Sequence, residues 1–454
     1  MASIKKLITF VTGIPLLFSG FFVLGAEKPV TPNYPDWAKN AVIYEVNIRQ
    51  HTTEGTFKAL EKDLPRLKEL GVDILWLMPV HPIGEKNRKG RLGSYYAVKD
   101  YKGINQDYGT DKDFDSFMKS AHKAGLKVIL DWVANHSAWD NPWMTLHPEW
   151  YQKDAAGKFV SPYDWTDVVS LDYHVPAMRL AMIESMQYWI EKFDVDGFRC
   201  DVAGLVPVDF WEQARTELQK KKPLFMLAED EENAALYQKA FDMSYGWKMH
   251  NLMSAVAKGE AGADSILRLQ HVVDSINPKW AIKMNFTTNH DENSWNGTVK
   301  EKYGLGGKAF GMLTYTLPGM ALIYSGQEAG LNKRLKFFEK DTIDWSNKDL
   351  VPYYKSLNKF KHKNPAIWNP PFGGDVVNID NSQPIKVISF TRTQGENKVI
   401  VIANLSSTPL KVVLKDVKTA IRFKDVLTGD VIEIKPGSPL VLQGWQYRLG
   451  TLEN

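Results

Sequence analysis

Gly197-Phe198-Arg199-Cys200-Asp201-Val202-Ala203 has the pattern of a buried strand that carries an arginine and a carboxylate near its carboxyl end. Because side chains alternate between the two faces of a strand, Arg199 and Asp201 point to one side and Cys200 to the other. A guanidinium beside a carboxylate favours the ionised form, which can act as a nucleophile, although a structural ion pair would have the same sequence. A catalytic carboxylate needs partners, so the rest of the chain decides between these two interpretations.

Strand-like and helix-like segments alternate along residues 41–325. Apolar runs of strand length recur eight times, and amphipathic stretches such as 56–70 separate them. Eight strands with helical crossovers predict an α/β fold of the (β/α)8 TIM barrel type, with the site at the carboxyl ends of the strands. The predicted strands are 41–47, 72–79, 126–133, the segment around Gly197, 224–229, 241–244, 282–288 and 320–325.

Two regions depart from this alternation. Residues 137–175 have no helical period and several Trp, Pro and Asp residues, so we predict a short B subdomain inserted after the third strand. From residue 372 onward, short β-rich runs are separated by turn residues, which predicts an all-β sandwich domain over 372–454. The barrel itself is assigned to residues 35–371.

A long loop, residues 81–109, follows the second predicted strand and carries a basic run. Lys86, Arg88, Lys89 and Arg91 are most simply interpreted as solvated side chains of this loop. The loop and residues 137–175 together determine how deep a cleft over the barrel would be.

Composition sets the broad class of the protein. The net charge of +3 and the hydrophobic content of 44% fit a globular protein and do not favour nucleic acid as a partner. Lys5 and Lys6 precede an apolar run over 7–24, which predicts a signal peptide over residues 1–26 and export to the periplasm or the medium. We expect no membrane segment after signal cleavage. Cys200 is the only cysteine, so the chain forms no internal disulfide.

Three acidic residues stand at the ends of predicted strands. Asp201 and Glu229 are one strand–helix unit apart, and Asp291 follows two such units later, so the three side chains are expected around one barrel mouth. Two carboxyl groups about 5 to 5.5 Å apart across a glycosidic bond hydrolyse it with retention, one as nucleophile and one as acid and base. The third carboxylate can stabilise developing positive charge.

Four short motifs resemble those of the α-amylase family of retaining glycoside hydrolases, glycoside hydrolase family 13. They occur in the order and at the spacing of that family, within a similarity that covers about residues 41–345. The motifs are Asp131-Trp132-Val133-Ala134-Asn135-His136, residues 197–203, Leu227-Ala228-Glu229-Asp230, and Phe286-Thr287-Thr288-Asn289-His290-Asp291.

The resemblance implies a role for each matching residue. Asp201 would be the nucleophile, Glu229 the acid and base, and Asp291 the stabiliser of the transition state. The implied substrate-binding residues are Arg199, His136, His290 and Tyr96.

Two departures from the family pattern concern the metal and the substrate. Gly204 and Leu205 stand where calcium-dependent α-amylases have Lys and His. Asn135 matches a calcium ligand of the family, but Ser170 replaces the usual aspartate. We therefore predict no metal ligand in the site and no cofactor for the chemistry, and leave a structural calcium ion open.

These observations predict an exported retaining α-glycosidase that hydrolyses α-1,4-glucosidic bonds in starch, glycogen or maltodextrins through a covalent glycosyl-aspartate. The expected partner is an α-glucan polysaccharide or oligosaccharide, and no oligomeric state is indicated. Two alternatives remain open. One is an α-glucosidase, cyclomaltodextrinase or transglycosylase that acts on short α-glucans, and the other is an inactive sugar-binding protein on the same barrel.

Overall fold

The computed structural model of the chain describes residues 35–415 and 417–453. The predicted signal peptide over residues 1–26 lies outside these described residues. Within the two described ranges, every helix is too short or too polar to cross a membrane.

Eight parallel strands close into a barrel in the spatial order β1, β10, β9, β8, β7, β6, β3, β2. Each strand pairs in parallel with both neighbours, and all eight predicted strands are present, so the predicted barrel is confirmed. The strands are β1 (Ile43–Val46), β2 (Ile74–Leu77), β3 (Lys127–Trp132), β6 (Gly197–Cys200), β7 (Phe225–Ala228), β8 (Met243–Tyr245), β9 (Ile282–Asn285) and β10 (Met320–Tyr324).

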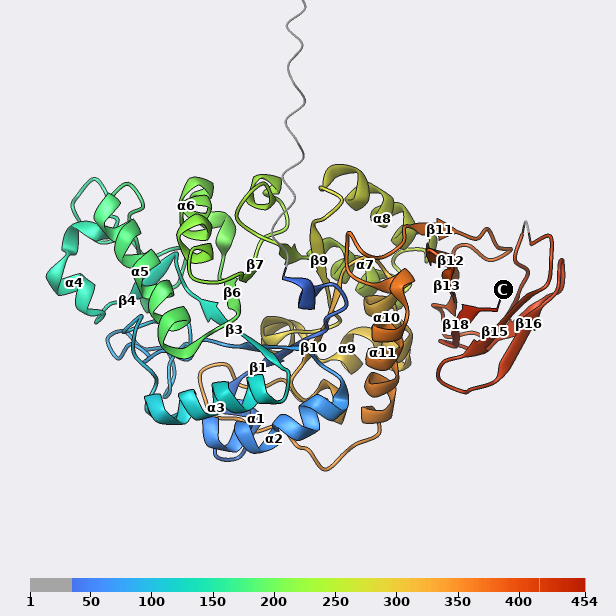
Figure 1. The fold of residues 1–454 in the computed structure, drawn as a ribbon, viewed down its shortest axis with the longest axis horizontal. Coiled ribbons are helices and arrows are strands. Elements are labelled where there is room, and N and C mark those ends of the chain that lie inside the picture. Colours follow the sequence, from blue (N-terminus) through green and yellow to red (C-terminus); the bar gives the residue numbers. More distant parts are fainter. Residues whose placement is uncertain (1–34, 416, 454) are drawn as a thin grey trace, which may run out of the picture. The chain divides into compact units, whose positions relative to one another are not determined.

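Helices connect the strands. The second helix begins at Thr56, whose hydroxyl accepts from the amide of Ala59 at 3.3 Å, and ends at Gly71 with a φ of +89° that suits glycine. The next long helix begins with a capping box, in which the side chains of Thr110 and Asp113 each accept from the backbone amide of the other. The helices are α1 (Ile48–His51), α2 (Phe57–Leu70), α3 (Asp111–Lys123), α4 (Pro142–Leu146), α5 (Pro176–Phe193), α6 (Val208–Gln219), α7 (Trp247–Ala257), α8 (Asp264–Ile276), α9 (Val299–Tyr303), α10 (Gly307–Thr316) and α11 (Val351–Lys363). Figure 1 shows helices such as α2, α3, α5 and α6 on the outside of the barrel strands.

The strands separate two hydrophobic cores. In β3, Val128 and Leu130 belong to the core between strands and helices, whereas Ile129 belongs to the core inside the barrel. This alternation is the one expected of a strand buried on both faces. The interior core below the mouth contains Ile43, Ile74, Trp76, Ile129, Phe225, Leu227, Met243, Tyr245, Ile282, Met284, Met320 and Leu322.

The inserted subdomain is a small hairpin with irregular connections. Strands β4 (His136–Ala138) and β5 (Val168–Ser170) pair in antiparallel fashion, and the short helix α4 lies between them in sequence. Ala138 and Val168 pack against Ile83 and Ala97 of the loop that follows β2. The insertion and this loop therefore form one packed unit beside the barrel mouth.

The C-terminal region is all-β, as predicted. A six-stranded antiparallel sheet and a two-stranded sheet enclose a core that includes Ile400, Ile402, Val412 and Leu442. The β-rich sequence over residues 440–447 does not form a single strand, because Trp445, with a φ of +61°, lies between β17 and β18. The strands are β11 (Val376–Asn378), β12 (Val387–Gln394), β13 (Asn397–Asn404), β14 (Leu410–Val412), β15 (Ile421–Asp425), β16 (Val431–Ile434), β17 (Leu440–Leu442) and β18 (Tyr447–Leu452).

Candidate active site

Asp201 directly follows β6, where its amide donates to the carbonyl of Trp132 at 2.9 Å. Arg199 is completely buried, and its Nη1 donates to Asp201 Oδ1 at 3.0 Å and to Asp131 Oδ1 at 2.8 Å. Cys200 belongs to the core between strands and helices. The predicted orientation is thus confirmed: Arg199 and Asp201 point to the same side, and Cys200 points to the other.

Glu229 directly follows β7 and lies beside Asp201. Its Oε2 forms an ion pair with Arg199 Nη2 at 2.9 Å and accepts from the amide of Val202 at 2.8 Å. Val202 adopts the left-handed region with a φ of +36°, which is unfavourable for a β-branched residue. A single guanidinium and a strained backbone turn therefore hold Asp201 and Glu229 next to each other.

Asp291 and His290 lie between β9 and a π-helical turn over Glu292–Asn296, a rare element that is frequent at functional sites. His290 Nε2 lies 3.3 Å from Asp291 Oδ2, and His290 Nδ1 lies 2.5 Å from Glu45 Oε1. Glu45 is fully buried in β1. The imidazole is accordingly fixed between two carboxylates.

Tyr96 and His136 complete the predicted set. The Tyr96 hydroxyl lies 2.8 Å from His290 Nε2 and 3.0 Å from Asp131 Oδ2, and its ring stacks on the imidazole of His290. His136 is buried at the start of β4, with the ring of Trp165 at a centroid distance of 5.5 Å. Both side chains line the same cavity as Asp201.

Burial and neighbouring charges determine the protonation of these groups. Burial and the charge of Glu229 raise the pKa of Asp201 well above its usual value, and Arg199 opposes them. As expected from the sequence, Arg199 lowers the pKa of Asp201 and so favours its ionised form. The effect of burial on this pKa is larger and has the opposite sign. Burial lowers the pKa of His136 to about 3, so its imidazole is neutral. Burial also disfavours the charged form of His290, yet Asp291 and Glu45 raise its pKa to about 9.

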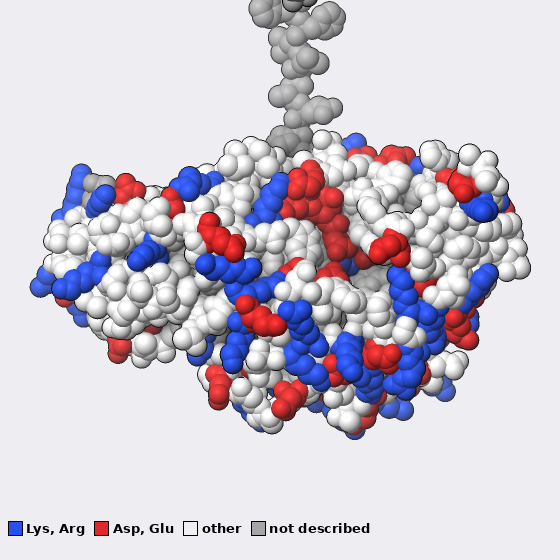
Figure 2. All heavy atoms as spheres, turned by 180° about the vertical axis from the view of Figure 1, so that it is seen from behind, with Lys and Arg blue, Asp and Glu red and all other residues white. Residues whose placement is uncertain are grey.

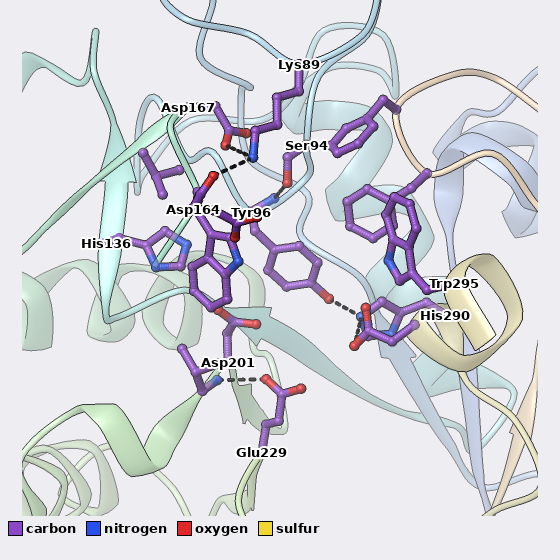
Figure 3. Close-up of a pocket in the computed structure, with 16 residues that line it drawn as sticks. Lys89, Ser94, Tyr96, His136, Asp164, Asp167, Asp201, Glu229, His290 and Trp295 are labelled. Atoms are coloured by element: carbon purple, nitrogen blue, oxygen red, sulfur yellow. Dashed lines mark hydrogen bonds and ion pairs between the residues drawn. The ribbon is translucent and has the colours of Figure 1, made fainter. Parts of the chain in front are cut away.

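These side chains surround a cavity of about 400 Å³ (Figure 3). All three predicted catalytic carboxylates line it, as do His136, His290 and Tyr96; Arg199 does not line it but contacts Asp201 from below the surface. The lining residues are Lys89, Ser94, Tyr96, His136, Asp164, Trp165, Asp167, Val168, Asp201, Val202, Glu229, His290, Asp291, Trp295, Phe337 and Phe338.

Several residues of the site were not predicted as such. Glu45 ends the first barrel strand, so the register that places Asp201 at a strand end could also have identified Glu45. Trp295 carries no pattern in the sequence that would bring it to the cavity. Lys89, interpreted from the sequence as a solvated side chain, is one-third exposed, but its Nζ also lies 3.4 Å from Asp167 and it lines the cavity.

The charge distribution fits a substrate without negative charge. Figure 2 shows a hollow bordered by a band of Asp and Glu side chains, while Lys and Arg side chains gather mostly lower on that face. An acidic border repels a polyanion.

The candidate calcium ligands do not form a suitable site. The Asn135 side chain lies 3.1 Å from His136 Nδ1, and Ser170 pairs with His136 across the hairpin. These positions supply an amide and a hydroxyl, whereas calcium requires several oxygen ligands that usually include carboxylates. Across residues 35–415 and 417–453, no three His, Cys, Asp or Glu side chains gather in a way that could hold a metal ion.

A (β/α)8 barrel with adjacent carboxylates at the strand ends, around a cavity of this size, is an arrangement that glycoside hydrolases use. Comparison with known families agrees, since the model of the α-amylase catalytic domain matches residues 42–149 and 146–372. The chain belongs to the α-amylase family.

Individual relatives support this assignment. The α-amylase MalA of Haloarcula japonica is 28% identical over 425 residues, which cover 88% of this chain and 60% of MalA. The solved structure of a noncanonic maltogenic α-amylase, AmyB from Thermotoga neapolitana, is 33% identical with a TM-score of 0.85 and covers 92% of this chain and 100% of AmyB. An α-amylase structure from Lactobacillus plantarum is 32% identical with a TM-score of 0.82, covering 91% and 99%. The chain thus spans about three fifths of the length of MalA.

Proposed function

We propose that this chain is a retaining α-glycosidase that hydrolyses α-1,4-glucosidic bonds in starch, glycogen or maltodextrins. The observation that carries the proposal is the placement of Asp201 and Glu229 on one buried guanidinium, facing one cavity. The α-amylase names of MalA and of the Lactobacillus plantarum protein support an α-glucan as substrate.

In the first step, Asp201 reacts in its ionised form, which the ion pair with Arg199 stabilises, and one of its carboxylate oxygens attacks the anomeric carbon of the bound sugar. The bond from that carbon to the glycosidic oxygen breaks, and Glu229 transfers its proton to the leaving oxygen. The products of this step are a shortened glucan with a free hydroxyl and a glycosyl ester on Asp201. Asp291 faces the cavity and stabilises the positive charge that develops on the sugar ring.

In the second step, Glu229 is ionised and takes a proton from water. The water oxygen attacks the same carbon from the side that the leaving group vacated, and the ester bond to Asp201 breaks. Two inversions at one carbon give overall retention. His136, His290 and Tyr96 line the cavity around this carbon and orient the sugar by hydrogen bonds and stacking.

The stereochemistry of the first product tests this function. Proton NMR recorded during the first minutes of maltoheptaose cleavage should show new α-anomeric ends before mutarotation produces the β-anomer. The initial appearance of the β-anomer would exclude the double displacement. The absence of cleavage of any α-1,4-glucan would favour the inactive sugar-binding alternative.

We also propose that the protein is exported, on the basis of the basic and apolar N-terminal segment over residues 1–26. Expression of the full chain in a bacterial host should give enzyme in the periplasm or medium that has lost this segment. N-terminal sequencing of that material checks the cleavage site, and retention of the segment in cytoplasmic enzyme would contradict the proposal.

A further inference from the structure

The direction of a glucan in the cavity follows from the chemistry of the two carboxylates. Glu229 protonates the leaving oxygen, so the departing part of the substrate lies on the Glu229 side. The part that stays attached to Asp201 lies on the opposite side. Because each α-1,4-linked sugar is joined through its anomeric carbon to the next sugar, this retained part carries the non-reducing end.

The side opposite Glu229 is crossed by a polar bridge. Figure 3 shows Lys89, Asp164 and Asp167 together at the end of the cavity away from Glu229, with Tyr96 and His136 in between. Lys89 Nζ lies 3.4 Å from Asp167 Oδ1 and donates to the carbonyl of Asp164 at 3.2 Å. The Asp167 side chain is only 6% exposed, so this carboxylate is nearly desolvated by the wall and by Lys89.

The bridge stands on a rigid wall rather than on two independent loops. Ile83, Ala97, Ala138 and Val168 form one apolar cluster between the loop that carries Lys89 and the hairpin that leads to Asp167. The amide of Ala138 also donates to the carbonyl of Val98 at 2.9 Å. This apolar cluster and the backbone hydrogen bond hold the two segments together, so that Lys89 and Asp167 stay within reach of each other.

The space between Asp201 and this bridge is limited. Tyr96 and His136 line the cavity between Asp201 and the end that carries Asp164 and Asp167 (Figure 3). The cavity of about 400 Å³ lies at the lower end of the range of roughly 300 to 1,000 Å³ for small-molecule sites. A site of this volume leaves room for only a short glucan segment between Asp201 and the bridge.

We propose that Lys89 and Asp167 close the retained side of the cleft after the second sugar and bind the hydroxyl groups of the non-reducing end. The enzyme then acts from that end and releases a disaccharide, and it does not cleave inside long or cyclic chains. This inference rests on the proposed function and adds the position of cleavage. Asp167 accepts a hydrogen bond from a terminal sugar hydroxyl, and Lys89 donates one.

Maltoheptaose with a fluorescent label at its reducing end distinguishes the outcomes. The wild-type enzyme should first give one labelled product, two sugars shorter than the substrate, and should cleave β-cyclodextrin at least 100-fold more slowly than maltoheptaose. A mixed series of labelled products at early times, or rapid cleavage of β-cyclodextrin, would overturn the closed end while leaving the proposed function intact. Absence of all cleavage would instead contradict the proposed function.

Two substitutions test the bridge itself. Lys89→Ala should produce several labelled products and at least a tenfold increase in β-cyclodextrin cleavage relative to the wild type. Asp167→Asn keeps the shape of the side chain and should raise KM for maltotriose more than it lowers kcat. Lys86→Ala is the matched control, because Lys86 is an exposed residue of the same loop that does not line the cavity. An unchanged single product in Lys89→Ala, together with an unchanged KM for maltotriose in Asp167→Asn, would overturn the inference.

Discussion

The interior of the barrel contains two layers of opposite character on the same strands. In β1, Ile43 belongs to the apolar interior core, and Glu45, two residues later, contacts His290 in the site. In β3, Ile129 belongs to the same core, and Asp131 contacts Arg199. Two residues along each strand thus separate a lower, apolar layer, which stabilises the fold, from an upper layer, which contains the charged residues of the site. The comparison indicates that substitutions in the upper layer will cost activity and those in the lower layer will cost stability.

The largest expected effect is in the upper layer. Asp201→Asn should lower kcat by at least about 10³-fold and Glu229→Gln by roughly 10² to 10⁴-fold, because each removes a group that reacts directly. Neither change should lower the melting temperature, since each relieves repulsion between buried carboxylates. Steady-state kinetics on maltoheptaose and thermal unfolding check both parts. Near-wild-type turnover of either variant would contradict the assigned roles.

The next largest effect is expected in the lower layer, where a substitution should reduce stability and leave activity unchanged. Met284 is completely buried in the interior core, so Met284→Ala should lower the free energy of unfolding by about 2 to 5 kcal/mol. The activity of each folded molecule should stay close to that of the wild type. Urea unfolding and active-site-normalised kinetics measure the two quantities, with Met284→Leu as a volume-conserving control. A loss of kcat without a loss of stability would show that the layers are not separable.

A smaller effect is expected for Glu45, whose carboxylate favours the protonated form of the neighbouring His290. Burial lowers the pKa of His290, and the carboxylates of Asp291 and Glu45 together raise it to about 9, against the charge of Arg199. Protonated His290 therefore stabilises the fold fully below a pH of about 6.5, and this contribution disappears as the pH rises through about 9.

Glu45→Gln should move this loss of stability, and the alkaline limb of kcat/KM, to lower pH. Melting temperatures and kcat/KM between pH 5 and about 10 check both shifts. His290→Gln, which cannot titrate, should lack the shift and serves as the control. An alkaline limb that stays in place in Glu45→Gln would indicate that Glu45 has only a packing role.

The smallest expected effect concerns the rim of the cavity. Trp295 is half exposed, and its ring lies 5.4 Å from that of Phe337. Trp295→Ala should raise KM for maltotriose by roughly 2- to 10-fold, corresponding to about 0.5 to 1.5 kcal/mol of aromatic contact, with little change in kcat or stability. Trp295→Phe should restore most of the affinity. A change in kcat larger than the change in KM would indicate that Trp295 contributes to the reaction itself, as the residues of the charged layer do, and not mainly to substrate binding.

Sequence patterns predicted the features that depend on the alternation of apolar runs and amphipathic stretches along the chain. The order of apolar runs gave all eight barrel strands, and strand-end positions brought Asp201, Glu229 and Asp291 to one cavity. Three strands of the six-stranded C-terminal sheet were missed, namely the short β11 and the pair β15 and β16. Charged residues alternate with apolar ones in β15 and β16, as in Ile421–Asp425, because one face of each strand is solvated.

Features that depend on contacts across the chain could not be predicted in this way. Lys89 lies in a basic run, and its partner Asp167 lies in an inserted segment whose path no local periodicity reveals. The resistance of Asp201 to ionisation follows from burial and from the charge of Glu229, and both depend on the assembled barrel. Sequence motifs thus identify the catalytic side chains, whereas the packing of the folded chain determines their protonation and the shape of the cleft.

Val202, the residue after the proposed nucleophile, has a further consequence for the history of this protein. Its left-handed backbone costs about 1 to 3 kcal/mol, and the same turn aims its amide at Glu229. Selection for heat resistance alone would favour glycine or asparagine at this position, while selection for turnover would oppose any change that moves the amide. The amino acid found at this position in heat-adapted descendants would therefore record which of the two pressures prevailed.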